Sequence, residues 1–107
     1  MRRSAVEVKR IIHKTINLLK NYIVIDQGYL FGSYACGGQH KDSDIDLAFF
    51  SMTLNRMELD EKITIVAKLG EQLGCAVDIH LFPKDCLKKA RHTNFYGHIL
   101  ETGKRIA

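Results

Sequence analysis

A glycine–serine pair and two nearby carboxylates are the residues whose types and spacing are best suited to chemistry. Gly32-Ser33 is followed by ten residues and then by Asp44-Ile45-Asp46, which opens an apolar run. Alternate side chains of a β-strand share a face, so Asp44 and Asp46 are expected to point the same way. Neighbouring carboxylates repel each other unless a cation lies between them, and Mg²⁺ prefers oxygen ligands. The spacing therefore predicts a divalent-cation site.

The Gly32-Ser33 pair predicts the complementary half of such a site. Glycine lets the backbone approach a ligand closely, a helix N-terminus attracts anions, and the serine hydroxyl adds a hydrogen-bond donor. Either half alone is more typical of an ordinary helix cap or a solvated strand face. Together, a phosphate-binding turn and a metal-binding carboxylate pair indicate chemistry on a nucleoside triphosphate.

These residues resemble a motif of the nucleotidyltransferase superfamily that includes DNA polymerase β, and most closely that of its small prokaryotic branch, the minimal nucleotidyltransferases. That branch carries Gly-Ser, ten residues and Asp-x-Asp, which this chain matches at Gly32, Ser33, Asp44 and Asp46. The superfamily uses a third carboxylate on a later strand, and Asp78 matches it. Its neighbour on the same strand face, His80, is expected to lie close by without being a ligand.

The resemblance covers residues 28–82 and implies a role for each matching residue. The three aspartates are expected to be catalytic and to bind Mg²⁺, with two ions as the expected number. Gly32 and Ser33 are expected to bind the phosphates of ATP. Family members often carry an arginine shortly after the Gly-Ser pair, where this chain has Cys36, and Lys41 is the candidate to contact a phosphate instead. An acceptor hydroxyl would attack the α-phosphorus and displace pyrophosphate.

Minimal nucleotidyltransferases of this size resemble the antitoxin half of two-component systems whose other half is a HEPN ribonuclease toxin. The resemblance implies an adenylyltransferase that moves AMP from ATP to a hydroxyl of the toxin, expected to be a tyrosine, and so silences it. Two alternatives stay open. The chain could neutralise its partner by occlusion without catalysis, or it could be the catalytic subunit of a small-molecule or RNA nucleotidyltransferase.

Length and composition agree with a single catalytic domain over residues 1–107. The chain is 46% hydrophobic and 26% charged, as in ordinary soluble globular proteins. Its net charge of +4 permits a nucleotide, an RNA or an acidic protein partner, although no direct nucleic-acid binding is expected. The three cysteines have no paired spacing, which favours reduced thiols, and no apolar run approaches the roughly 20 residues of a membrane span. A cytoplasmic protein is expected.

The resemblance implies an α/β (α+β) fold with a small mixed sheet flanked by helices, as in polymerase β-like nucleotidyltransferases. Helices are expected at 5–22, 56–73 and 95–102, with another beginning at Pro83, and strands at 29–31, 45–50 and 75–82. The second long helix is expected to turn one apolar stripe to the core, namely Leu59, Ile63, Val66, Ala67, Gly70 and Leu73. Lys84, Lys88, Lys89 and Arg91 form a basic patch without an assigned role.

Overall fold

The computed structural model describes residues 5–32, 45–74 and 77–107. Within them the elements follow one another along the chain as α1 (Ala5–Leu19), β1 (Gln27–Phe31), β2 (Ile45–Ser51), the 3-10 helix η1 (Thr53–Arg56), α2 (Leu59–Leu73), β3 (Val77–Pro83), the 3-10 helix η2 (Lys84–Lys89), α3 (Phe95–Thr102) and β4 (Lys104–Arg105). None of these helices has the length and apolar character needed to cross a membrane.

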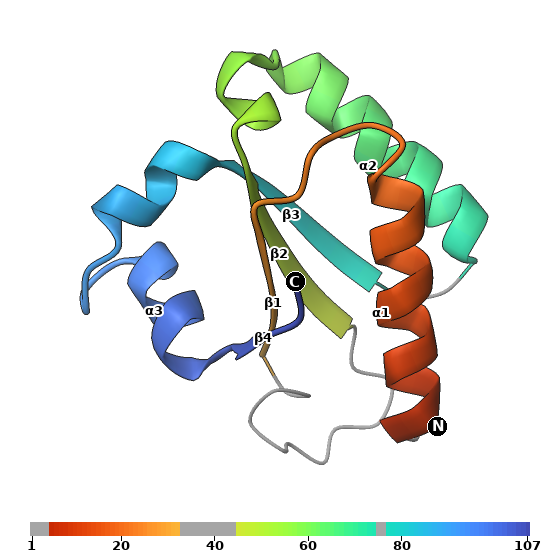
Figure 1. Cartoon of the computed structure of the whole chain (residues 1–107), viewed down its shortest axis with the longest axis horizontal. Coiled ribbons are helices and arrows are strands. Elements are labelled where there is room, and N and C mark those ends of the chain that lie inside the picture. The colour runs from red at the N-terminus through yellow and green to blue at the C-terminus, as the bar shows by residue number, and fades with distance from the viewer. Residues whose placement is uncertain (1–4, 33–44, 75–76) are drawn as a thin grey trace.

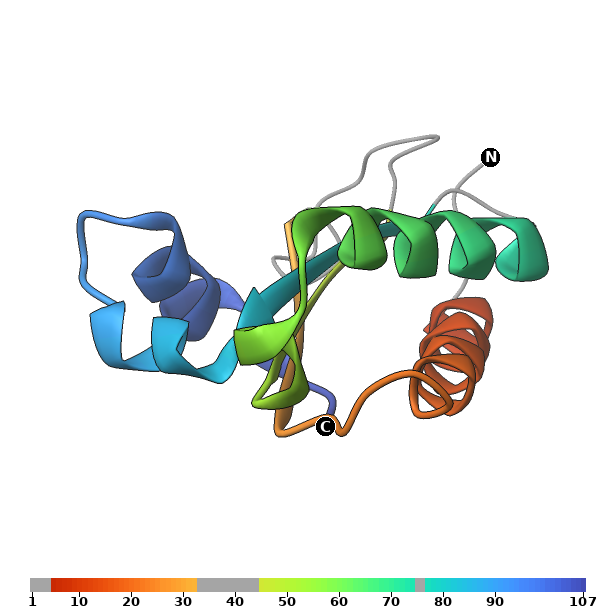
Figure 2. The same cartoon turned by 90° about the horizontal axis from the view of Figure 1, so that it is seen from above.

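The centre of the molecule is a mixed sheet with the strand order β3-β2-β1-β4 (Figure 1). Strand β2 pairs in parallel with β3, whereas β1 is antiparallel to both of its neighbours. Seen from above, α1 and α2 lie on one side of the sheet, and η2 and α3 lie on the other (Figure 2). The prediction of a small mixed sheet flanked by helices is therefore confirmed.

Strand β2 carries the core on both of its faces. Ile45, Leu47 and Phe49 belong to the cluster formed with α1 and α2. Ala48 and Phe50 point the other way and belong to a second cluster with residues of β1, η2 and α3. A strand covered on both faces has a nearly continuous apolar sequence, and in β2 the half-buried Asp46 interrupts it. The interruption falls at the second residue of the strand, opposite Phe31 of β1.

Several boundaries differ from the sequence prediction for local reasons. Helix α1 ends at Leu19 instead of residue 22. The predicted start of α2 at residue 56 is wrong because Glu58 is extended and immediately precedes a helix that begins at Leu59. Pro83 does not open an α-helix: it ends β3 and immediately precedes the 3-10 helix η2. The short strand β4 was not predicted, whereas α3 has the predicted bounds and is capped by Asn94.

The core stripe predicted for α2 is wrong in part. Leu59 and Ile63 are 71% and 59% exposed, and Ile65 and Leu69 are the buried residues. Ala67 and Gly70 are also exposed, whereas Val66 and Leu73 pack against the core as predicted. The sequence offers two apolar stripes at helical spacing, and only the contacts with α1 and the sheet select between them.

Replacing one residue of each stripe with alanine should show which stripe contributes to the stability of the fold. Leu69→Ala is expected to lower the free energy of unfolding by about 2–5 kcal/mol, because it leaves a cavity in the core. Leu59→Ala removes an exposed side chain and is expected to change it by less than about 0.5 kcal/mol. Urea unfolding followed by circular dichroism measures both values. Equal losses in the two variants would contradict this orientation of α2.

Candidate active site

Two of the predicted carboxylates lie side by side on adjacent strands. Asp46 of β2 is paired directly with Asp78 of β3 in the parallel register, so both side chains leave the same face of the sheet. Asp46 is half-buried, and the Asp78 side chain is 56% exposed. The sequence predicted that each aspartate lies on a strand, and the pairing of β2 with β3 brings the two carboxylates together.

His80 joins this pair from the next position on the same face of β3. Its Nε2 lies 3.3 Å from Asp78 Oδ2, and one ligand atom from each of Asp46, Asp78 and His80 lies within 4.8 Å of the others. From the sequence alone, His80 was expected to be a neighbour of the carboxylates and not a ligand. The alternation of side chains along β3 placed His80 on the same face as Asp78. Only the structure shows how close its ring lies to the two carboxylates.

Aromatic rings surround the His80 imidazole. Its ring centroid lies 5.3 Å from that of Phe31, 6.2 Å from that of Phe82 and 5.9 Å from that of Phe95. The Phe82 ring stacks on the imidazole, and the other two meet it at an angle. These contacts leave the His80 side chain 31% exposed, so its orientation is restricted from several sides.

Gly32 closes the site from the end of β1. Its φ of +77° is in the left-handed region, which favours glycine. Its neighbour Phe31 is paired with Asp46 across the antiparallel strands, and a Cβ at position 32 would overlap Asp46 Oδ2. The backbone conformation therefore favours glycine here, and any side chain at this position would also displace the Asp46 carboxylate.

The structure brings together Gly32, Asp46 and Asp78 among the predicted site residues. The other three, Ser33, Lys41 and Asp44, lie outside the described residues. Two carboxylates at paired strand positions form a donor set that fits a hard divalent cation such as Mg²⁺. The fit rests on the two carboxylates as oxygen donors and on their closeness. A cation site of this kind is expected where phosphoryl groups are transferred.

One lysine of the basic patch has an acidic partner among the described residues. Lys84 of the basic patch lies with its Nζ 3.6 Å from Asp26 Oδ1, so this lysine is engaged in a surface ion pair.

A hydrogen bond with Cys86, together with partial burial, raises the pKa of Tyr96 above its ordinary value, and the phenol stays protonated at neutral pH. Cys86 is a buried free thiol, as expected, whereas Cys36 and Cys75 lie outside the described residues.

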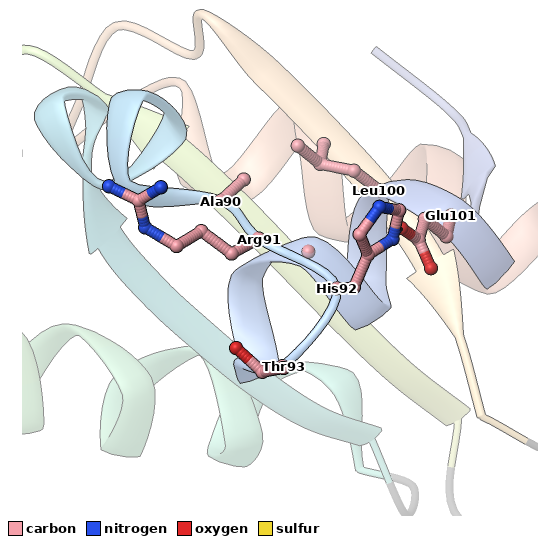
Figure 3. A pocket seen from close by; sticks show the side chains of 7 residues that line it. Ala90, Arg91, His92, Thr93, Leu100 and Glu101 are labelled. Carbon is pink, nitrogen blue, oxygen red and sulfur yellow. The ribbon is translucent and has the colours of Figure 1, made fainter.

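A separate hollow of about 550 Å³ lies between α3 and the loop that precedes it (Figure 3). Its lining residues are Ala90, Arg91, His92, Thr93, Gly97, Leu100 and Glu101. His92 Nδ1 lies 2.6 Å from Glu101 Oε1, and Asn94 Oδ1 accepts hydrogen bonds from the backbone of Arg91 and Gly97. No motif in the sequence indicated this hollow. Its lining contains none of the carboxylates at the paired strands, so the candidate site remains the pair Asp46 and Asp78.

Comparison with known proteins agrees with this geometry. The family described as "Polymerase beta, Nucleotidyltransferase" matches residues 13–107. A protein of Methanocaldococcus jannaschii named "Putative protein adenylyltransferase" is 34% identical over 73 residues, which cover 68% of this chain and 73% of that protein.

Two solved structures are also similar. A chain from a toxin–antitoxin structure with AMP-PNP is 28% identical, with a TM-score of 0.62 over 88% of this chain and 70% of that one. A chain from the complex of a tri-AMPylated Shewanella oneidensis HEPN toxin with an MNT antitoxin has the same TM-score over 92% of this chain and 70% of that one. At 23% identity, the latter likeness shows the fold alone. The family match spans Gly32, Asp46 and Asp78, and the chain therefore belongs to the polymerase beta nucleotidyltransferase family and is a nucleotidyltransferase.

Proposed function

We propose that this protein is a Mg²⁺-dependent protein adenylyltransferase that acts in the cytoplasm as the antitoxin of a HEPN ribonuclease toxin. It transfers AMP from ATP to a hydroxyl of the toxin, with tyrosine as the acceptor. The observation that carries nucleotidyl transfer is the direct pairing of Asp46 with Asp78 beside the left-handed Gly32. The choice of a protein acceptor is supported by the relatives.

The proposal gives each residue of the site a task. Asp46 and Asp78 hold the divalent cation, which neutralises charge on the triphosphate when it is bound. Gly32 lets the backbone at the end of β1 lie against the Asp46 carboxylate. We assign Ser33 and Lys41 to the phosphates and Asp44 to the cation on the sequence motif. Asp78 is the more exposed carboxylate, and we assign it to the acceptor side, where it takes the hydroxyl proton or shares a second ion.

The relatives support a protein acceptor and a HEPN partner. One is named as an adenylyltransferase of proteins, one belongs to a toxin–antitoxin structure with an ATP analogue, and one accompanies a HEPN toxin that carries AMP. The site is also accessible to a large acceptor. Asp78 is exposed, and Phe95 beside His80 is 45% exposed. A hydroxyl on a protein surface can therefore approach the carboxylates from solvent.

A labelling experiment tests the proposal. The full chain is incubated with α-labelled ATP, Mg²⁺ and the protein encoded by the neighbouring gene as the proposed HEPN partner, and labelled peptides are identified by mass spectrometry. We expect AMP on a tyrosine of the partner and loss of its ribonuclease activity. Replacing that tyrosine with phenylalanine is the matched control and should remove the label without changing complex formation.

Other outcomes of the same experiment would contradict the proposal. A partner that is inhibited without any label would indicate neutralisation by occlusion. Label on an RNA or a small molecule, with none on the partner, would indicate a different acceptor class and would leave the nucleotidyltransferase chemistry intact.

A further inference from the structure

We propose that His80 is a direct ligand of the divalent cation held by Asp46 and Asp78, so that the site combines one nitrogen donor with carboxylate oxygens. Such a site favours Mn²⁺ over Mg²⁺ more strongly than carboxylates alone do. The inference rests on the proposed function, because it requires a cation at this pair of strands. It adds a ligand that the sequence motif does not contain.

The positions of the donor atoms carry the inference. Small divalent cations hold their ligands at about 2.1 Å, so adjacent ligands of an octahedron lie about 3.0 Å apart and opposite ones about 4.2 Å apart. His80 Nε2 and Asp78 Oδ2 are separated by 3.3 Å, which is close to the spacing of adjacent ligands. With Asp46 included, the donors lie within 4.8 Å of one another. Small side-chain rotations are therefore sufficient to place all three on one ion.

The surroundings of His80 hold its ring in place. Phe31, Phe82 and Phe95 contact the imidazole, and its Nε2 is the nitrogen that lies near Asp78. A ligand whose ring is already oriented loses little conformational freedom when an ion binds. The carboxylates are positioned by the sheet, because Asp46 and Asp78 lie at paired positions of two hydrogen-bonded strands.

The identity of the donors determines which metal is preferred. Mg²⁺ favours carboxylate and water oxygens, whereas imidazole nitrogen suits transition metals better. A histidine that only donated a hydrogen bond to Asp78 would leave the choice between Mn²⁺ and Mg²⁺ unchanged. A histidine bound to the ion shifts that choice toward Mn²⁺, and the shift disappears when the nitrogen is removed.

Pulsed electron paramagnetic resonance of Mn²⁺ bound to the full chain detects a coordinated imidazole nitrogen directly. We expect a ¹⁴N coupling in the wild type that changes to a ¹⁵N coupling when histidine is labelled with ¹⁵N. In His80→Gln the coupling should be lost and Mn²⁺ affinity should fall by about 10-fold or more. Mg²⁺ affinity should change much less. His98→Gln, which removes an exposed histidine of α3, is the control and should leave the signal intact.

The outcomes separate this inference from the proposed function. Mn²⁺ that binds in the wild type and is lost in Asp46→Asn, but shows no imidazole coupling, would overturn His80 as a ligand and keep the carboxylate site. No binding of Mn²⁺ or Mg²⁺ to the wild type, with or without ATP, would overturn both. The isotope-labelling measurement uses the wild-type chain, so an absent imidazole coupling would overturn the inference however well His80→Gln folds.

Discussion

Asp46→Asn is expected to lower the rate of nucleotidyl transfer by about 10³-fold. A bound metal ion supplies several kcal/mol of stabilisation to a phosphoryl-transfer transition state, and each 1.4 kcal/mol or so changes the rate tenfold. Asp46 lies between Asp78 on β3 and Gly32 at the end of β1, so its loss removes the central carboxylate of the described site. The side chain keeps its size, and the fold is expected to persist.

The measurement is kcat/KM for labelling of the partner, made together with the free energy of unfolding in urea. Glu71→Gln is the matched control, because it also removes one negative charge but lies exposed on α2. We expect the control to label its partner at the wild-type rate. An Asp46→Asn variant that remains folded and labels at close to the wild-type rate would refute the site.

Gly32→Ala should damage both stability and activity. A non-glycine residue in the left-handed conformation costs about 1–2 kcal/mol, and Gly32 has a φ of +77°. The added methyl group would also overlap Asp46 Oδ2 and displace that carboxylate. A displacement of about 1 Å in a catalytic group can reduce the rate by about 10²-fold, and we expect a loss of at least this size.

Gly74→Ala separates the loss of stability from the loss of activity. Gly74 caps α2 with a φ of +62°, and a Cβ there would meet nothing within 4 Å. This variant should therefore have a similar backbone strain and a similar loss of unfolding free energy, but normal labelling activity. If both variants lose stability equally and both keep their activity, the contact between position 32 and Asp46 has no role in catalysis.

The local features of this protein were predictable from sequence because they depend on near neighbours. The period-two pattern of β2 placed Asp46 on the face opposite Ile45 and Leu47, and the same pattern placed Asp78 opposite Ile79. The bounds of α3 were also predicted, since both ends carry local signals. Asn94 caps its beginning and Gly103 follows its end. Such signals act over a few residues and need no knowledge of the fold.

Long-range pairing decided the remaining features. Both apolar stripes of α2 have helical spacing, and packing against α1 and the sheet selected the one with Ile65 and Leu69. The parallel register of β2 and β3 set Asp46 opposite Asp78 and brought His80 to within 3.3 Å of the latter. Periodicity shows which face a side chain takes, but the hydrogen bonds between strands determine which residues meet on that face.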